Sequence, residues 1–155
     1  MMRSILLDTN ILIKIIKDPK EQEAMQLLNL LEEGALIYTT PLIKHEVLRF
    51  YKQKDHEQEY QKAVNLLKML KNLDINQQIG DLATEIVRFE RQKYPERYDT
   101  QVNGKTKNIN KYNFDIFHVA TAKHHQLELE SNDEDVFSRI EDLYNEMKNE
   151  MQQKS

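Results

Sequence analysis

The sequence predicts an α/β fold in one domain that spans residues 1–155, and three observations predict it. Ser4–Leu7 is a short apolar run that stops at polar residues, and a helical pattern follows at once. Further short strand candidates at 35–38 and 127–130 also lead toward helical patterns. The chain is 39% hydrophobic over 155 residues, which is enough for one core. Short apolar strands that alternate with helices are typical of a parallel sheet.

Composition narrows the class of protein. The formal net charge of −4 argues only weakly against a nucleic-acid binder, because carboxylates that bind metal present no bare charge. The absence of cysteine excludes disulfides and thiolate metal sites. No apolar run approaches the roughly 20 residues of a membrane helix, and the N-terminus lacks the apolar region of a secretory signal. We therefore expect a soluble, cytoplasmic protein that has no membrane segment.

Asp8 directly follows the first expected strand. It would lie at the carboxyl end of that strand, which is the edge where open α/β sheets build their sites. A carboxylate in this place is either a helix cap or a functional ligand. Asn10 is able to cap the following helix alone, which leaves Asp8 for another role.

The next elements bring a glutamate close to the core. A helix is expected at 20–33 and a strand at 35–38, after which Thr40 is the expected N-cap of a second helix. Glu46 falls near the core-facing edge of this second helix. A lone glutamate on a helix is usually a surface residue, so Glu46 is a candidate for a functional role only together with Asp8.

The middle of the chain is predicted as helix, short strand, helix and loop. A helix ends near Asn72, a strand follows at 73–75, and a helix is expected over 76–94. The apolar face of the helix over 76–94 comprises Ile79, Leu82, Ile86 and Phe89. The segment 95–111 is polar and irregular. It is either a basic flap beside a site for an anionic substrate or a solvated insertion, and its basic residues are Arg97, Lys105, Lys107 and Lys111.

Asp115 is expected in the first turn of a helix that is apolar on most sides. The helix dipole favours an acid in that position, which is the alternative to a functional role. His118 lies one turn further on, and we expect it to be a packed histidine.

The final acids follow the expected strand at 127–130. Asp133 and Asp135 lie just beyond its end, so acids follow this strand as Asp8 follows the first one. The alternative is that Ser131 or Asp133 caps a C-terminal helix, which is predicted over 138–155.

Four acids thus share one structural context, namely Asp8, Glu46, Asp115 and Asp133. If the strands are parallel, their carboxyl ends meet at one edge and the acids can converge. Clustered carboxylates repel one another, so convergence requires raised pKa values or a cation. Mg²⁺ and Mn²⁺ prefer oxygen ligands, and ions held in this way promote displacement at phosphorus. The spacing therefore suggests metal-assisted hydrolysis of a phosphodiester.

Four motifs in order carry a family resemblance. They are Leu6-Leu7-Asp8-Thr9-Asn10, Glu46 on its helix, Asp115 followed by a small-residue helix, and Ser131-Asn132-Asp133-Glu134-Asp135. From Leu6 to about Ile140 the chain resembles the PIN-domain family, most closely the VapC-type ribonuclease toxins of bacterial toxin–antitoxin pairs.

The resemblance implies a PIN-like fold with a twisted, mostly parallel sheet of four or five strands flanked by helices. It implies an endoribonuclease that uses Mg²⁺ or Mn²⁺, is blocked by a cognate antitoxin and forms a homodimer. The implied metal ligands and catalytic residues are Asp8, Glu46, Asp115 and Asp133. The implied supporting residues are Asn10, Ser131 and Asp135. Where the family has an aromatic residue after its last acids this chain has Val136, so the choice between Asp133 and Asp135 stays open.

Basic residues near these motifs are candidates for contact with RNA phosphates. They are Lys14, Arg49, Lys105, Lys107 and Lys111. The loop at 95–111 is longer than the family pattern, which would make substrate choice unlike that of a typical toxin.

Two other functions remain open at this stage. One is a PIN-like binding or scaffold module without activity, against which the presence of all four acids argues. The other is a DNA-directed or structure-specific nuclease, which the short chain disfavours.

Overall fold

The computed structural model describes residues 2–18, 20, 22–52, 54–98, 101–102, 105–106, 109–131 and 134–153. The chain forms two compact units. The sheet unit comprises residues 1–75 and 125–133, and the helical unit comprises residues 76–124 and 134–155.

The sheet unit contains a four-stranded parallel sheet with the order β3-β2-β1-β6. The strands are β1 (Ser4–Leu7), β2 (Leu36–Thr39), β3 (Lys71–Asn72) and β6 (Glu128–Glu130). In the central strand β1, Leu6 is paired with Tyr38 on one side and with Leu129 on the other. The predicted parallel sheet and its number of strands are confirmed.

The third strand lies two residues earlier than the sequence predicted, at 71–72 and not at 73–75. Leu73 still donates its backbone N–H to the carbonyl of Thr39 at 2.8 Å, beyond the end of the paired segment. The apolar residues that indicated the strand therefore mark the point where the chain leaves the sheet.

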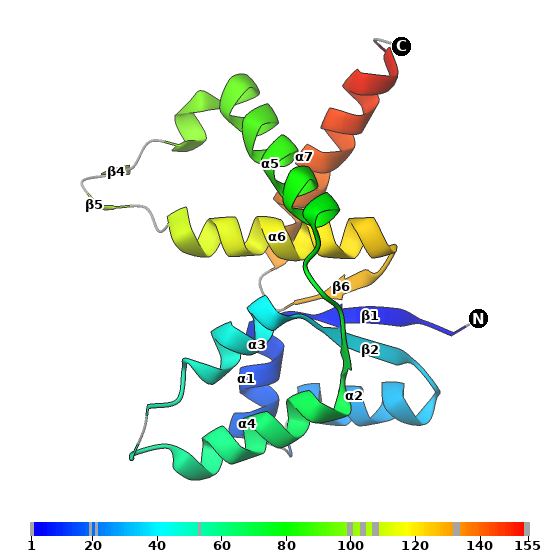
Figure 1. The fold of residues 1–155 in the computed structure, drawn as a ribbon, viewed down its shortest axis with the longest axis vertical. Helices are drawn as coiled ribbons and strands as arrows, with labels where there is room; N and C mark the ends of the chain where they lie inside the picture. Colours follow the sequence, from blue (N-terminus) through cyan, green and yellow to red (C-terminus); the bar gives the residue numbers. More distant parts are fainter. Residues whose placement is uncertain are drawn as a thin grey trace. The chain divides into compact units, whose positions relative to one another are not determined.

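Four helices accompany this sheet (Figure 1). They are α1 (Thr9–Lys17), α2 (Gln22–Glu32), α3 (Pro41–Leu48) and α4 (Glu57–Met69). α1 packs against the other three, and α3 also packs against α4. Apolar side chains of β1, β2 and the four helices are removed from water here, which is the main favourable term in folding. Side chains without any solvent exposure include Ile5, Leu6, Leu12, Ile43, Val47 and Ala63.

Two local predictions for the ends of these helices are confirmed. Gly34 follows α2 with a φ of +85°, a backbone conformation that glycine adopts without steric cost. Thr40 caps α3, because its Oγ1 accepts a hydrogen bond from the backbone N–H of Ile43 at 3.1 Å. The caps fix where α2 ends and where α3 begins.

The helical unit contains three long helices, α5 (Gln77–Lys93), α6 (Ile109–His125) and α7 (Glu134–Gln153). Its segment 95–111, which the sequence predicted to be irregular, begins with the 3₁₀ helix η1 (Pro95–Tyr98). An antiparallel pair follows, formed by β4 (Gln101–Val102) and β5 (Lys105–Thr106). The last residues of the segment already belong to α6.

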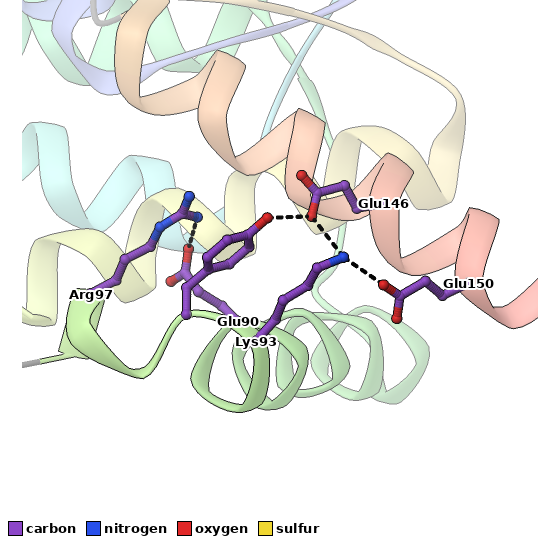
Figure 2. A network of polar contacts seen from close by, with 6 residues as sticks. Glu90, Lys93, Arg97, Glu146 and Glu150 are labelled. Atoms are coloured by element: carbon purple, nitrogen blue, oxygen red, sulfur yellow. Dashed lines mark hydrogen bonds and ion pairs between the residues drawn. The ribbon is translucent and has the colours of Figure 1, made fainter.

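α5 and α7 pack against each other and are joined by polar side chains (Figure 2). Lys93 on α5 forms ion pairs with Glu146 and Glu150 on α7. The hydroxyl of Tyr94, just after α5, donates to Glu146 at 2.9 Å. The C-terminal helix is therefore attached to α5 by charged contacts as well as by its apolar face.

Among the residues that the structure describes, no helix is long and apolar enough to cross a lipid bilayer.

Candidate active site

Asp8 lies where β1 ends and α1 begins. Its backbone N–H donates to the carbonyl of Glu130 at 3.0 Å, which extends the pairing of β1 with β6. Its side chain is buried, with 3% of the residue exposed. Oδ2 of Asp8 accepts a hydrogen bond from the Ser131 hydroxyl at 2.9 Å. The expected supporting residue Ser131 therefore holds the carboxylate directly.

The prediction that Asn10 caps α1 is wrong. Asp8 occupies the N-cap position, with extended backbone angles, and Asn10 is the second residue of the helix. The helix begins earlier than expected because Thr9 already has helical geometry. Asp8 nevertheless makes no capping hydrogen bond with its side chain. Its carboxylate is therefore not used as a helix cap, as predicted, but for a different reason.

Glu46 lies on α3, in the sheet unit. Its neighbours along the helix, Ile43 and Val47, are fully buried, and Glu46 itself is half-buried. This agrees with the expected position near the core-facing edge of the helix. The Thr40 cap fixes where α3 begins. Glu46 is thereby held in the second turn of this helix.

Asp115 lies in the second turn of α6 and not in the first, because the helix begins at Ile109. The helix dipole acts within the first turn, so it does not account for an acid at this place. Asp115 is buried, with 5% exposed. Burial of a carboxylate is costly unless a partner or a bound cation compensates for it, so Asp115 is not an ordinary surface acid.

His118 is buried as predicted, with 1% exposed, and it lies beside Asp115. A carboxylate oxygen of Asp115 and a ring nitrogen of His118 lie within 4.8 Å of each other. Two atoms this close are able to bind one cation together. The spacing of three residues on one helix was the signal for this pair, but the sequence assigned His118 only to packing.

Of the last two candidate acids, the structure describes only Asp135. Asp133 lies outside the described residues. Asp135 is exposed in the first turn of α7, which begins at Glu134, four residues earlier than predicted.

The candidate contacts for RNA are on the surface where they are described. Lys14 is half exposed and forms an ion pair with Glu23 at 3.6 Å. Arg49 and Lys111 are exposed, whereas the side chains of Lys105 and Lys107 lie outside the described part of the chain.

A cavity of about 620 Å³ opens in the sheet unit beside α1. Its lining includes Asn10, two residues after Asp8, and Lys14, a candidate contact for RNA. The remaining lining residues are Ile13, Lys17, Phe50, Tyr51, His56 and Glu59. Basic and aromatic side chains therefore lie next to the chain segment that carries Asp8.

The helical unit contains a buried acid that the sequence analysis did not identify. Glu90 is fully buried, and both its oxygens accept from the Tyr112 hydroxyl at 2.8 Å. Nη1 of Arg97 forms an ion pair with Glu90 Oε2 at 3.1 Å. The buried residues of α5 are Ile79, Ala83, Ile86 and Glu90, while the predicted Leu82 and Phe89 are half-buried. The spacing of four, three and four residues from Ile79 was the available signal.

The contact with Glu90 alters the acidity of Tyr112. Burial raises the pKa of the Tyr112 hydroxyl, and the hydrogen bond to Glu90 and the charge of Glu90 raise the pKa further. The nearby guanidinium of Arg139 lowers the same pKa but does not outweigh these effects. Tyr112 is therefore a neutral hydrogen-bond donor at physiological pH.

The chain is similar to known proteins over most of its length. The model of the PIN domain family matches residues 5–143. No curated protein matches the chain. Several solved structures have the same fold at low sequence identity.

Three of these structures illustrate the likeness. VapBC2 from Rickettsia felis bound to a promoter DNA fragment is 21% identical with a TM-score of 0.67, over 88% of this chain and 92% of that chain. DNA-bound VapBC from Salmonella typhimurium is 18% identical with a TM-score of 0.67, over 90% of this chain and 93% of that chain. FitAcB from Neisseria gonorrhoeae is 16% identical with a TM-score of 0.61, over 88% of this chain and 93% of that chain. The family match covers most of the sequence, and the parallel sheet agrees with it, so this chain belongs to the PIN domain family.

Proposed function

We propose that this protein is a metal-dependent endoribonuclease and the toxin of a toxin–antitoxin pair. The observation that carries the proposal is the burial of Asp8 and Asp115, the aspartates of two family motifs, in a chain of the PIN domain family. Aspartate is seldom buried so completely unless it is paired or binds a metal.

The proposed metal ligands are the four acids that the sequence indicated, Asp8, Glu46, Asp115 and Asp133. We add His118 as a possible fifth donor, because its ring nitrogen lies near the carboxylate of Asp115. Mg²⁺ and Mn²⁺ both suit carboxylate oxygens, and an imidazole nitrogen suits Mn²⁺ better than Mg²⁺. A bound divalent ion would supply activation of the attacking water and stabilise charge on the phosphate oxygens.

The side chains of this protein would position the substrate and the acids. Ser131 orients the carboxylate of Asp8 through its hydrogen bond. Lys14, Arg49 and Lys111 are exposed cations that would contact phosphates of the RNA strand. Asn10 and Asp135 would support the acids, as the family resemblance implies.

The proposed partner is an antitoxin protein that blocks the site. The structural neighbours support this, since two of them are VapBC complexes and a third is described as a toxin–antitoxin complex from Klebsiella pneumoniae. We also propose that the protein acts in the cytoplasm and forms a homodimer, as in the toxin family that the sequence resembles.

The test is cleavage of pooled cellular RNA by the purified protein with Mg²⁺ or Mn²⁺, compared with EDTA. We expect cleavage only with metal, and its loss in Asp8→Ala and Asp115→Ala at unchanged circular dichroism. Matched controls are Asp74→Ala in the sheet unit and Asp81→Ala in the helical unit, since both aspartates are exposed. Both control variants should cleave like the wild type.

A second readout is Mn²⁺ binding by calorimetry, which should weaken in Asp8→Ala and Asp115→Ala. Full cleavage by either of these variants would overturn the assignment of the site. A parallel assay on single-stranded DNA separates the proposed activity from that of a DNA-directed nuclease. Faster cleavage of DNA than of RNA would overturn the proposed substrate.

A further inference from the structure

We propose that Arg139 binds a phosphate of the RNA strand close to Asp115. The proposal rests on the proposed ribonuclease function and names a substrate contact that the sequence analysis did not identify. It follows from a set of contacts within the helical unit.

Arg139 is an exposed side chain on α7 that lies against an aromatic ring. Its Cζ is 5.3 Å from the centroid of the Tyr112 ring. A guanidinium in this position is attracted by the face of the ring and loses little conformational freedom when it binds a ligand. Its N–H groups form a fork that matches the oxygens of a phosphate.

The ring that supports Arg139 is itself fixed. Tyr112 is 9% exposed, and its hydroxyl donates to both oxygens of Glu90. Glu90 is fully buried at the end of α5 and cannot move into solvent without breaking these bonds. Arg139 therefore stands on a rigid support, which distinguishes it from a mobile surface cation.

The charge of Arg139 is also available. Arg97 neutralises Glu90 at 3.1 Å, and Lys123 on α6 is within 3.9 Å of Glu141. Arg139, by contrast, contacts the side chain of Tyr112 and forms no ion pair with a carboxylate among the residues that the structure describes. An oriented guanidinium without an acidic partner favours an anionic ligand.

The position of Tyr112 relates Arg139 to the proposed chemistry. Tyr112 and Asp115 are three residues apart on α6 and are both buried, so they share one face of the helix. Three residues correspond to about 4.5 Å along the helix axis. A phosphate held by Arg139 would thus belong to a nucleotide near the one that is cleaved.

The test compares two variants of α7 that each remove one cation from a tyrosine ring. Lys148 is the matched control, because its Nζ lies 5.6 Å from the Tyr144 ring centroid on the same helix. Each variant is made in an Asp115→Asn background, so that a labelled single-stranded RNA of mixed sequence is bound but not cut. Binding is measured by fluorescence anisotropy over a range of KCl concentrations, with thermal unfolding as a check of folding.

We expect Arg139→Ala to weaken RNA binding about tenfold, as for loss of one charge-assisted contact. The slope of log affinity against log salt should fall in magnitude by about 0.7, the value for one phosphate on a single strand. Arg139→Lys should lie between wild type and Arg139→Ala, since it keeps the charge but loses the fork. Lys148→Ala should bind like the parent protein.

Equal affinities and salt slopes for Arg139→Ala and Lys148→Ala would overturn this proposal. If the wild type still cleaved RNA in that case, the proposed function would stand without this contact. If the protein neither bound nor cleaved RNA, both proposals would fail together.

Discussion

The hydroxyl of Ser131 donates a 2.9 Å hydrogen bond to Oδ2 of Asp8. The two residues are 123 positions apart in the sequence, yet each directly follows one of two neighbouring strands, β6 and β1. The parallel pairing of these strands brings their carboxyl ends together. A small polar residue from one strand end thus sets the direction of an acid at the other.

Replacing Ser131 tests this relationship. We expect Ser131→Ala to lower kcat/KM for RNA about tenfold, because a hydrogen bond to a charged group contributes about 1.5–3 kcal/mol. Ser131→Thr keeps a hydroxyl and is the control, with activity closer to wild type. Steady-state cleavage at saturating Mn²⁺ gives the comparison. Equal activity of the alanine variant and the wild type would show that the bond does not matter for the reaction.

Removal of the Glu90 carboxylate should destabilise the protein strongly. Glu90→Ala leaves the Tyr112 hydroxyl without its acceptor and Arg97 without its ion-pair partner, at a cost of about 3–5 kcal/mol for breaking a buried pair. Glu146→Ala is the control in the same unit, because the Glu146 side chain is 40% exposed and its loss should cost about 1 kcal/mol or less. Urea unfolding measures both, and equal losses would contradict the expectation.

Stability at high pH should depend on Tyr112. Its pKa is raised in the folded state by burial and then by Glu90, while an unfolded tyrosine titrates near pH 10. The stabilisation is therefore fully present below about pH 10 and is lost as the pH rises toward the folded pKa. Above about pH 10, the free energy of unfolding of the wild type should fall more steeply than that of Tyr112→Phe, by up to about 1.4 kcal/mol per pH unit. Parallel urea titrations at each pH measure both slopes, and identical slopes would rule out this role of Tyr112.

The cap of α3 should contribute both to stability and to the site. Thr40→Val removes the oxygen that accepts the Ile43 N–H, and a lost cap costs about 1 kcal/mol. Thr40→Ser keeps the oxygen and should be closer to wild type. Thermal unfolding measures the effect, and RNA cleavage by Thr40→Val at 25 °C reports whether Glu46 is still held correctly. A valine variant as stable as the serine variant would contradict the capping role.

The toxin role predicts an effect on growth. Expression of the protein alone in a bacterial host should slow growth, because cleavage of cellular RNA stops protein synthesis. Asp115→Asn should relieve the effect at the same level of expression, as measured by growth curves with immunoblots. Normal growth with confirmed wild-type expression would contradict the toxin role and leave the nuclease activity open.

Periodicity and turn chemistry in the sequence were sufficient for most of the fold. The apolar run before Asp8 predicted a parallel strand, and Thr40 with its following proline predicted the start of α3; both are confirmed. These features depend on local patterns and on caps, which a single sequence contains.

The differences arise where distant residues decide the structure. Residues 109–111 are mostly polar and were assigned to a loop, but they form the start of α6, where Tyr112 is bound by Glu90 from α5. Likewise, the spacing from Ile79 places Glu90 on the buried face of α5, but a glutamate is usually exposed, so it was not identified. His118 was assigned to packing, because its nearness to Asp115 gains meaning only when both are known to be buried.

The order of the strands has a consequence for synthesis of the protein. β1 is made first but lies between β2 and β6, and β6 is not translated until residues 128–130. The carboxylate of Asp8 therefore leaves the ribosome long before the hydroxyl that orients it. A nascent chain therefore lacks this arrangement until the ribosome has translated β6 and Ser131.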